Sequence, residues 1–302
     1  MKLLITGGSG TIGKKITKLA LSKNYKVNIL SRNKNLISNN INLKYFYWDP
    51  NLKLINSECF VGVDSVINLA GFSIFINWSK KNKSKILNSR LNSTSFILNH
   101  IYNKKIKIRS FISASGISAY ENSLINISNE KHSINDTNSF INQVVIKWED
   151  KASEFQFKLP DISFSTMRIG LVLSKSGGLF KICSLLSRFY ILSPLGKGNQ
   201  WQSWIHEEDV ANIFISSSEK SRKGIFNLVS PNPVRQIELI NKIASINKSK
   251  VIFPNIPSFF VKKIFGEMSE IILSSQNVES IYLNDYKFIY DKLDDALLDL
   301  SL

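Results

Sequence analysis

The sequence is poor in the residues that build metal sites and disulfide frameworks. Its 302 residues include only two cysteines and three histidines. Cys59 and Cys183 lie far apart, without CxxC spacing and without a histidine cluster nearby, so we expect no metal site and no disulfide. Apolar runs stay below the ~18 residues that a membrane helix requires, and Met1 leads straight into an expected strand instead of a signal segment. We therefore expect a cytoplasmic protein without a membrane partner.

Acidic residues are also scarce, which leaves a formal net charge of +16. Clustered Lys and Arg would attract a polyanion. The lysines are instead scattered among Asn, Ile and Ser, as in residues 80–85 and 242–250, and no aromatic-basic alternation accompanies them. We therefore expect no nucleic-acid partner. The 43% of hydrophobic and 21% of charged residues are typical of a folded globular protein.

Short apolar runs alternate with segments of helical periodicity through the first half of the chain. The runs predict strands at residues 2–6, 26–30, 43–47, 63–69, 109–113 and 164–173. The periodic segments predict helices at residues 14–22, 80–102, 143–155, 235–246 and 291–300. This alternation is typical of an α/β fold in which helices cover both faces of a parallel sheet. We predict a Rossmann-type, doubly wound parallel sheet.

A glycine-rich turn joins the first expected strand to the first expected helix. It fits both G-x-x-G-x-x-G and G-x-G-x-x-G. The early glycines allow a tight turn, Gly10 lets the backbone approach a pyrophosphate, and Gly13 allows close packing of the helix. The helix N-terminus then offers free N–H groups to phosphates. This context predicts a dinucleotide site made by Thr6, Gly7, Gly8, Ser9, Gly10, Thr11, Ile12 and Gly13.

The end of the second expected strand indicates which dinucleotide is bound. NAD sites usually carry Asp or Glu there, whereas an Arg accommodates the 2′-phosphate of NADP. Here Ser31 and Arg32 follow Leu30, and no acid is near. Arg32 can pair with a phosphate through two hydrogen bonds, or it is a solvated loop charge. NADP(H) is favoured.

Two later loops fit the same cofactor. The segment Asn68, Leu69, Ala70 and Gly71 ends a strand with small residues where the nicotinamide ribose would pass. Asp49 ends the third strand near the expected adenine. An ordinary turn accounts for either loop equally well.

Together, the segments TGGSGTIG, SRN, NLAG and ISAS resemble the extended short-chain dehydrogenase/reductase superfamily. More closely, the chain resembles its NAD-dependent epimerase/dehydratase-like branch of epimerase-family proteins, with a C-terminal region like DUF1731. The branch-specific matches run nearly end to end and comprise Trp78, Ser89-Arg90, Thr94, Trp148-Glu149, Arg168–Gly170, Gly177-Gly178, Gly196–Gln200, Trp204–His206, Asp209, Gly224–Asn227, Ser230–Val234 and Gly266-Glu267.

The resemblance implies a catalytic Ser or Thr, and a Tyr followed four residues later by a Lys. That spacing puts the pair on one helix face, and the cation favours the tyrosinate form. The pair is missing, because none of the nine tyrosines has Lys four residues later. Phe140 and Val144 stand where the resemblance would place the Tyr and the Lys.

Three residues remain as catalytic candidates. Ser115 stands where the superfamily has its Ser, and Tyr120 follows in the next loop, although a packed loop tyrosine is equally compatible. His206 follows the glycine-rich segment 196–200 and two tryptophans that suit a substrate-side wall. It acts either as an acid/base or as a hydrogen-bonded structural residue. Arg90 is predicted to be a cofactor-binding residue. Its guanidinium either binds an anionic group of the ligand or forms an ion pair that fixes a loop.

Two functions follow from these observations. The first is an NADP(H)-binding oxidoreductase or sugar-nucleotide epimerase acting by hydride transfer on a sugar nucleotide or carbonyl compound. The second is a catalytically silent, nucleotide-sensing Rossmann protein, since a fold does not dictate function. We expect residues 1–173 to form the NADP(H)-binding domain and residues 174–302 a smaller, interwoven C-terminal substrate-side lobe. The substrate and the oligomeric state stay open.

Overall fold

The computed structural model describes residues 1–36, 38, 40–134 and 139–301. An eight-stranded sheet crosses the molecule in the order β12-β8-β6-β5-β1-β2-β3-β4. Its strands are β1 (Lys2–Thr6), β2 (Lys26–Ser31), β3 (Leu43–Asp49), β4 (Leu54–Ile55), β5 (Ser65–Asn68), β6 (Ser110–Gly116), β8 (Ser163–Ile169) and β12 (Gly224–Leu228). Neighbouring strands are parallel except for β4, which is antiparallel to β3. The strand order reverses between β1 and β5, where doubly wound folds bind ligands.

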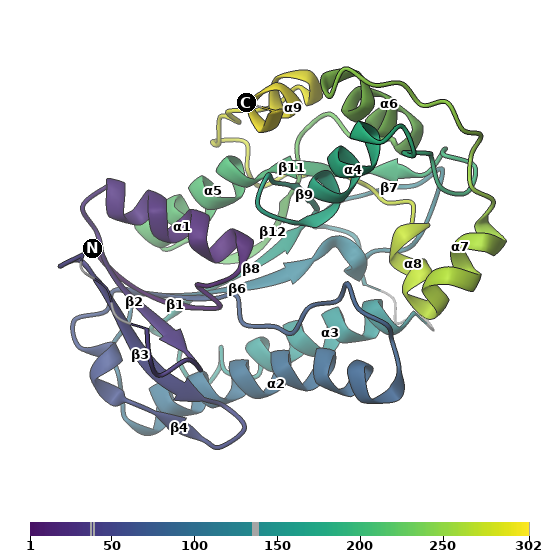
Figure 1. The fold of residues 1–302 in the computed structure, drawn as a ribbon. Coiled ribbons are helices and arrows are strands. Elements are labelled where there is room, and N and C mark those ends of the chain that lie inside the picture. The colour runs from purple at the N-terminus through teal and green to yellow at the C-terminus, as the bar shows by residue number, and fades with distance from the viewer. Residues whose placement is uncertain (37, 39, 135–138, 302) are drawn as a thin grey trace.

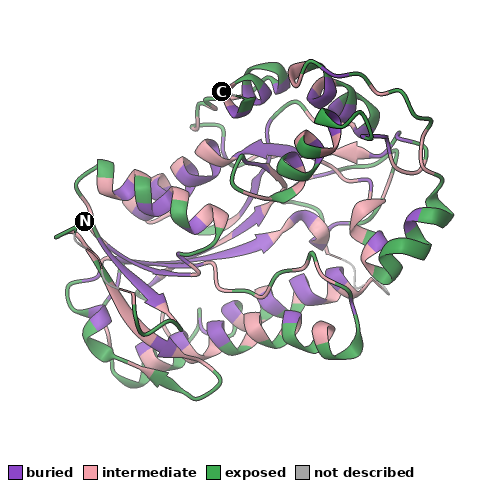
Figure 2. Cartoon of the chain, in the orientation of Figure 1, coloured by how far each residue is buried: buried purple, intermediate pink, exposed green. Residues whose placement is uncertain are grey.

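Helices cover both faces of this sheet (Figure 1). One face carries α1 (Thr11–Ser22) and α5 (Glu207–Lys220), and the other carries α2 (Lys80–Asn103) and α3 (Phe140–Ser153). Because successive side chains of a strand point to opposite faces, Leu3 and Ile5 join the core under α1 and α5, whereas Leu4 joins the core above α2. The central strands are buried along their length (Figure 2). The predicted α/β fold class is confirmed.

A third core lies in the second half of the chain. It gathers α4 (Gly178–Arg188), α6 (Gln236–Ile246) and α9 (Leu293–Ser301) around Leu173, Trp204 and Leu239. The shorter elements are η1 (Ser57–Phe60), η2 (Ile117–Ala119), β7 (Ile127–Ser128), β9 (Leu171–Leu173), β10 (Trp201–Gln202), β11 (Trp204–His206), β13 (Val234–Arg235), α7 (Ser258–Phe265), η3 (Gly266–Met268), α8 (Ser269–Ile272) and β14 (Asn277–Val278).

The two halves of the chain interlock. Strand β12 completes the main sheet beside β8, and β14 pairs with β7. The strand expected at 164–173 is divided, because Gly170 still bonds to Leu228 whereas Leu171 bonds to Ser203 beside β11. Helices α4 and α5 were not predicted. The domain boundary after residue 173 stays a prediction.

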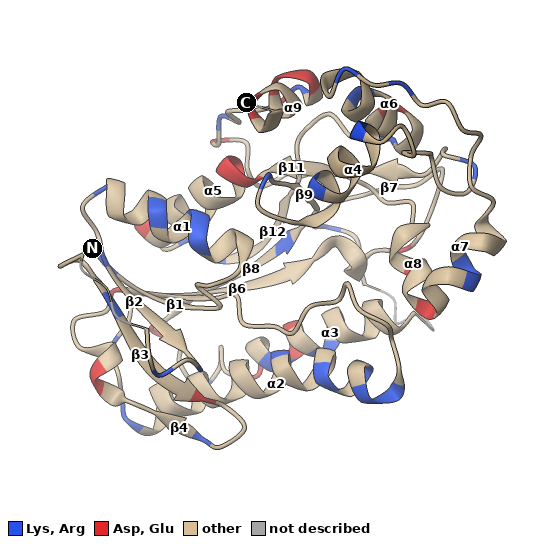
Figure 3. Cartoon of the chain, in the orientation of Figure 1, with Lys and Arg blue, Asp and Glu red and all other residues tan. Residues whose placement is uncertain are grey.

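Four further properties of the described residues bear on the chemistry. None of their helices is both long and apolar enough to cross a bilayer. They contain no group of three or more His, Cys, Asp or Glu that could hold a metal ion. Cys59 and Cys183 are free and buried, and burial raises the pKa of each thiol to about 12, so neither is a reactive thiolate at neutral pH. Lys and Arg are spread over many elements, with Asp and Glu between them (Figure 3).

Candidate functional site

The glycine-rich loop between β1 and α1 folds tightly on itself. Gly7 has a φ of +68°, and a Cβ there would lie 2.7 Å from the carbonyl oxygen of Leu69. A Cβ at Gly13 would lie 2.4 Å from the carbonyl oxygen of Gly7. The amide of Gly10 donates to that same oxygen over 3.0 Å and closes the turn. Both Gly7 and Gly13 are therefore required by sterics, and Gly13 packs against the loop itself.

The start of α1 is left open for an anion. Its N-cap is Gly10, which brings no capping side chain, and the first turn contains no acidic residue. A Cβ at Gly10 would meet only the Gly7 oxygen, at 3.3 Å, so no other described residue crowds the loop at this position. The first amides of a helix lack intrahelical acceptors and favour a negative charge. The loop thus fits the pyrophosphate of a dinucleotide.

Two of the expected cofactor residues lie behind this loop. Thr6 and Asn68 are fully buried. The Thr6 hydroxyl donates to Asn68 Oδ1 over 2.8 Å and accepts the amides of Leu69 and Ala70, each over 3.1 Å. Asn68 Nδ2 donates to Thr94 over 2.9 Å. These residues join the loop after β1 to the loop after β5, and so act on a ligand through the backbone they position.

At the end of β2, the structure leaves Arg32 available. Arg32 is exposed, and none of the ion pairs among the described residues involves it. Ser31 Oγ accepts the amide of Asn33 over 3.0 Å. Asp49 Oδ1 accepts the amide of Asn51 over 2.9 Å and so stabilises its own turn. Direct contacts of Ser31, Arg32 and Asp49 with a cofactor stay predictions.

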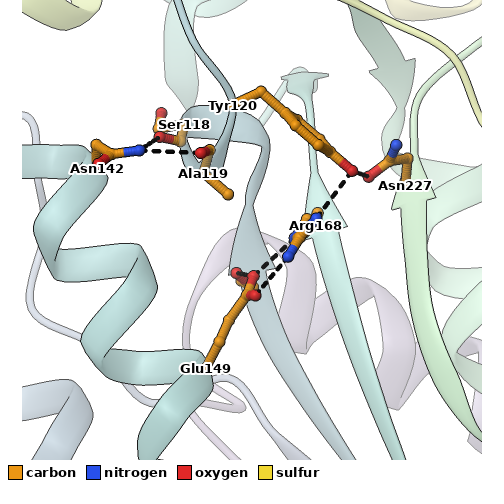
Figure 4. Close-up of polar contacts among 8 residues, drawn as sticks. Ser118, Ala119, Tyr120, Asn142, Glu149, Arg168 and Asn227 are labelled. Carbon is orange, nitrogen blue, oxygen red and sulfur yellow. Dashed lines mark hydrogen bonds and ion pairs between the residues drawn. The ribbon is translucent and has the colours of Figure 1, made fainter. Parts of the chain in front are cut away.

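A chain of polar contacts crosses the carboxyl end of the sheet (Figure 4). The hydroxyl of Ser115, at the end of β6, donates to Glu149 Oε1 of α3 over 2.5 Å. Arg168 of β8 donates to both Glu149 oxygens, Nε over 2.9 Å and Nη2 over 2.7 Å. Arg168 Nη1 donates to the Tyr120 hydroxyl over 2.9 Å, and that hydroxyl donates to Asn227 Oδ1 of β12 over 2.9 Å. We call these five residues the Ser115–Asn227 chain.

The charges in this chain compensate one another. Burial by itself lowers the pKa of Arg168, but the hydrogen bonds and the ion pair with Glu149 outweigh it and raise that pKa. Burial raises the pKa of Tyr120, although the nearby Arg168 opposes the shift. Tyr120 is therefore a neutral phenol near pH 7, with one partner donating to it and one accepting from it.

The start of α3 is apolar where the superfamily carries its Tyr and Lys. Phe140 lies edge-on against Trp78 with ring centroids 5.0 Å apart, and Val144 is buried in the same cluster. Asn142 ties the helix to the loop after β6, because its Nδ2 donates to the carbonyl oxygens of Ser118 over 3.1 Å and Ala119 over 2.9 Å (Figure 4). Lys83 Nζ of α2 lies 5.0 Å from the centre of the Phe140 ring, but neither Phe140 nor Val144 can itself act as an acid or a base.

A cleft of about 320 Å³ lies beside this loop. It runs between the loop after β6, the start of α3 and the segment around α8, and it is lined by Ser118, Tyr120, Glu121, Asn122, Ser139, Ile141, Asn142, Glu270, Ile271, Ser274 and Gln276. Its volume lies at the lower end of the range for small-molecule sites.

His206 lies at the start of α5 and makes no contact with the Ser115–Asn227 chain among the hydrogen bonds and ion pairs of the described residues. It is fully buried, its Nδ1 accepts the amide of Glu208 over 3.2 Å at the start of α5, and its Nε2 lies 3.3 Å from Asp299 Oδ2 of α9. Its ring centroid is 4.0 Å from that of Tyr290. Burial lowers the pKa of His206, although Asp299 opposes the shift. These contacts make it the cap of α5, and none joins it to Ser115 or Tyr120. Its role as an acid stays a prediction.

Arg90 lies on α2 beneath the loop after β5. Its Nη1 donates to the carbonyl oxygens of Phe72 over 3.0 Å and Ile86 over 2.9 Å. Its guanidinium carbon lies 5.2 Å from the centre of the Trp148 ring. The tryptophan is itself fixed, because its indole N–H donates to Thr94 over 3.0 Å.

Sequence reasoning missed two residues that hold the site together. Asn227 carries a signal, because it ends one of the segments on which the resemblance rests. Asn142 carries none, since an Asn on a helix is ordinarily a surface residue. Both are buried here.

Comparisons with known proteins agree with this fold and show the family. Residues 3–228 match the family described as "NAD dependent epimerase/dehydratase family". Residues 256–300 match the "Domain of unknown function (DUF1731)". The epimerase family protein YfhF of Bacillus subtilis is 31% identical over 303 residues, covering 99% of this chain and 98% of YfhF.

Two solved structures are similar to this protein along its whole chain. The crystal structure of human epimerase family protein SDR39U1 (isoform2) with NADPH has a TM-score of 0.87 and 26% identity, covering 100% of this chain and 99% of the human one. MoeE5 in complex with UDP-glucose and NAD has a TM-score of 0.81 and 15% identity, covering 100% and 97%. The second likeness concerns the fold alone.

Proposed function

The chain belongs to the NAD dependent epimerase/dehydratase family, and on that premise we propose that it is an NADP(H)-dependent oxidoreductase of a small alcohol or carbonyl substrate. The observation that carries the proposal is the open, uncapped start of α1 at the point where the strand order reverses. Ser115 ends β6, two strands away from β1 in the same sheet. A dinucleotide held at α1 would extend its nicotinamide toward that edge.

NADP(H) is the cofactor in this proposal. Arg32 binds the 2′-phosphate at an end of β2 that has no carboxylate in residues 31–36. The human relative in complex with NADPH supports the choice. The residues around the cofactor are Thr6, Gly7, Gly8, Ser9, Gly10, Thr11, Ile12, Gly13, Ser31, Arg32, Asp49, Asn68, Leu69, Ala70, Gly71 and Arg90. The bound nicotinamide supplies or accepts the hydride.

Ser115 determines how the substrate oxygen is held. Its proton points to Glu149, so only its lone pairs remain for a ligand. Ser115 therefore accepts a hydrogen bond from a substrate hydroxyl. As that alcohol is oxidised, its O–H proton passes to Ser115 Oγ while the serine proton passes to Glu149 Oε1. Carbonyl reduction reverses both transfers. Arg168 and Tyr120 position Glu149 and the loop, and His206 enters no step.

One observation favours a second function, a nucleotide sensor without turnover. The hydroxyls of Ser115 and Tyr120 already have protein partners, and Phe140 and Val144 provide no acid or cation. A protein of this kind keeps the cofactor site and responds to its occupancy.

Titration with NADPH and NADH, followed by NADPH oxidation against carbonyl compounds and sugar nucleotides, separates the two functions. We expect preferential NADPH binding, turnover on one class of compound, and loss of that turnover in Ser115→Ala. Binding without turnover on any compound, and equal affinity for NADPH in Ser115→Ala and Tyr120→Phe, supports the sensor instead. A wild-type chain that binds neither dinucleotide rules out both functions.

A further inference from the structure

Two arginines near the carboxyl edge of the sheet differ in how their charge is balanced. Arg168 is paired with Glu149 through two hydrogen bonds. Arg90 has no carboxylate partner among the ion pairs of the described residues. Burial lowers the pKa of Arg90 to about 10, the shift expected for a cation removed from water without an anion beside it.

The guanidinium of Arg90 is held rigidly but keeps one edge unused. Nη1 makes the two bonds to the carbonyl oxygens of Phe72 and Ile86. Nε and Nη2 have no acceptor among the described residues. Gly71 of the loop after β5 lies over one face of the guanidinium, since a Cβ there would be 3.0 Å from Cζ, 3.1 Å from Nη2 and 3.3 Å from Nε. Glycine at position 71 therefore lets the loop backbone lie on this face, and the Nε/Nη2 edge points elsewhere.

The guanidinium lies near the cofactor loop. Gly71 is two residues from Leu69, whose carbonyl oxygen would be 2.7 Å from a Cβ on Gly7. On the other side, the guanidinium covers Trp148 of α3, one helical turn beyond Val144. Helix α2 thus places a positive charge between the loop after β5 and Trp148 of α3.

We propose that Arg90 binds a phosphate group of a ligand held beside the cofactor loop, which rests on the proposed function in so far as that ligand is NADP(H) or its co-substrate. A planar guanidinium with two free N–H groups on one edge matches two phosphate oxygens. The phosphate belongs either to the dinucleotide or to the second substrate. In both cases the ligand supplies the anion that the protein does not provide.

Affinity measured by calorimetry tests this role without any need for turnover. In Arg90→Met, which keeps an unbranched side chain on Trp148, we expect NADPH to bind about 10- to 100-fold more weakly, as for loss of a charge-assisted hydrogen bond. Arg90→Lys should recover part of the loss. Arg109→Met is the matched control, because Arg109 is exposed and paired with Asp64 at the opposite end of β6, and it should bind NADPH as the wild type does.

A second arm identifies the source of the phosphate. If Arg90→Met binds NADPH normally but no longer binds uridine diphosphate when saturated with NADPH, the phosphate is that of the substrate. If the variant binds both compounds as the wild type does, or if the wild type binds neither, the proposal is wrong. If the wild type shows no turnover on any compound, the proposed oxidoreductase function is wrong. The affinities for NADPH and uridine diphosphate then still decide whether Arg90 binds a phosphate.

A third measurement guards against a variant that fails to fold. Phenylglyoxal modification of the wild type, mapped by mass spectrometry, should slow at Arg90 when NADPH or uridine diphosphate is present and stay constant at Arg109. Equal rates at Arg90 with and without both ligands would overturn the assignment.

Discussion

The cofactor loop and the Ser115–Asn227 chain lie at the same edge of the sheet but are opposite in construction. The loop leads into a helix start that no capping side chain among the described residues satisfies, and its N-cap Gly10 is crowded only by the Gly7 oxygen. The chain consists of four buried side chains and the largely buried Glu149, and their hydrogen bonds to one another are already made. Unpaired donors gain from a ligand, whereas paired ones must first be released. Binding and turnover should therefore respond independently to mutation.

The largest effect is expected from Glu149→Leu, which leaves Arg168 buried without its anion. Arg168 is 2% exposed, and removal of one partner of a buried ion pair costs about 3–5 kcal/mol in the free energy of unfolding. Chemical denaturation measures this loss. Arg168→Met in the same chain should restore much of the stability. NADPH affinity of the folded fraction should hardly change, and a large loss would contradict the independence of the two regions.

Gly13→Ala should distort the cofactor loop and weaken cofactor binding. The new Cβ would lie 2.4 Å from the Gly7 oxygen, so the loop must shift, at an expected cost of about 1–3 kcal/mol. We expect at least about 100-fold weaker NADPH binding, since several amide contacts depend on the loop. Gly116→Ala is the control, because its Cβ would meet only Val145 Cγ2, at an ordinary 3.7 Å, and Ser118 N at 3.9 Å. Equal affinities in the two variants would show that the loop does not hold the cofactor.

Arg32→Ala sharpens the comparison within the cofactor site. Loss of one charge-assisted pair with the 2′-phosphate should lower the affinity for NADPH by about 10-fold and leave the affinity for NADH unchanged. Fluorescence titration with both dinucleotides measures the ratio. Arg188→Ala, at the exposed end of α4, controls for the general loss of positive charge. Equal weakening of NADPH and NADH would remove Arg32 from the site.

The smallest effect concerns His206 and the stability of the fold. Burial lowers its pKa below the ordinary value, so the unfolded chain binds the proton more readily. Its contribution to stability is thus complete at pH values above about 6.5 and declines as the pH falls through that range. His206→Asn retains a capping oxygen for α5 and should unfold with a shallower pH dependence between pH 7.5 and 5.5. If the stability of the wild type and of His206→Asn depends on pH in the same way, His206 is not the group whose protonation destabilises the fold.

The elements with local signals were predictable. The helix expected at 14–22 begins at Thr11, and the strand expected at 109–113 runs from Ser110 to Gly116, so these differ only at their ends. Helix α5 was not predicted, although its first turn carries Glu207, Glu208 and Asp209. Acidic residues in a first turn are a helix-start signal.

The amino-acid sequence by itself determined the cofactor loop, because a turn with this curvature requires glycines at fixed spacing within eight neighbouring residues. It also determined that no Tyr/Lys pair exists. Only the tertiary structure decided that Glu149 serves both Ser115 and Arg168, and that Arg90 has no such partner. Those side chains come from β6, α2, α3 and β8, and the packing and register of distant elements set which charges meet. Residue identity alone carries no such information.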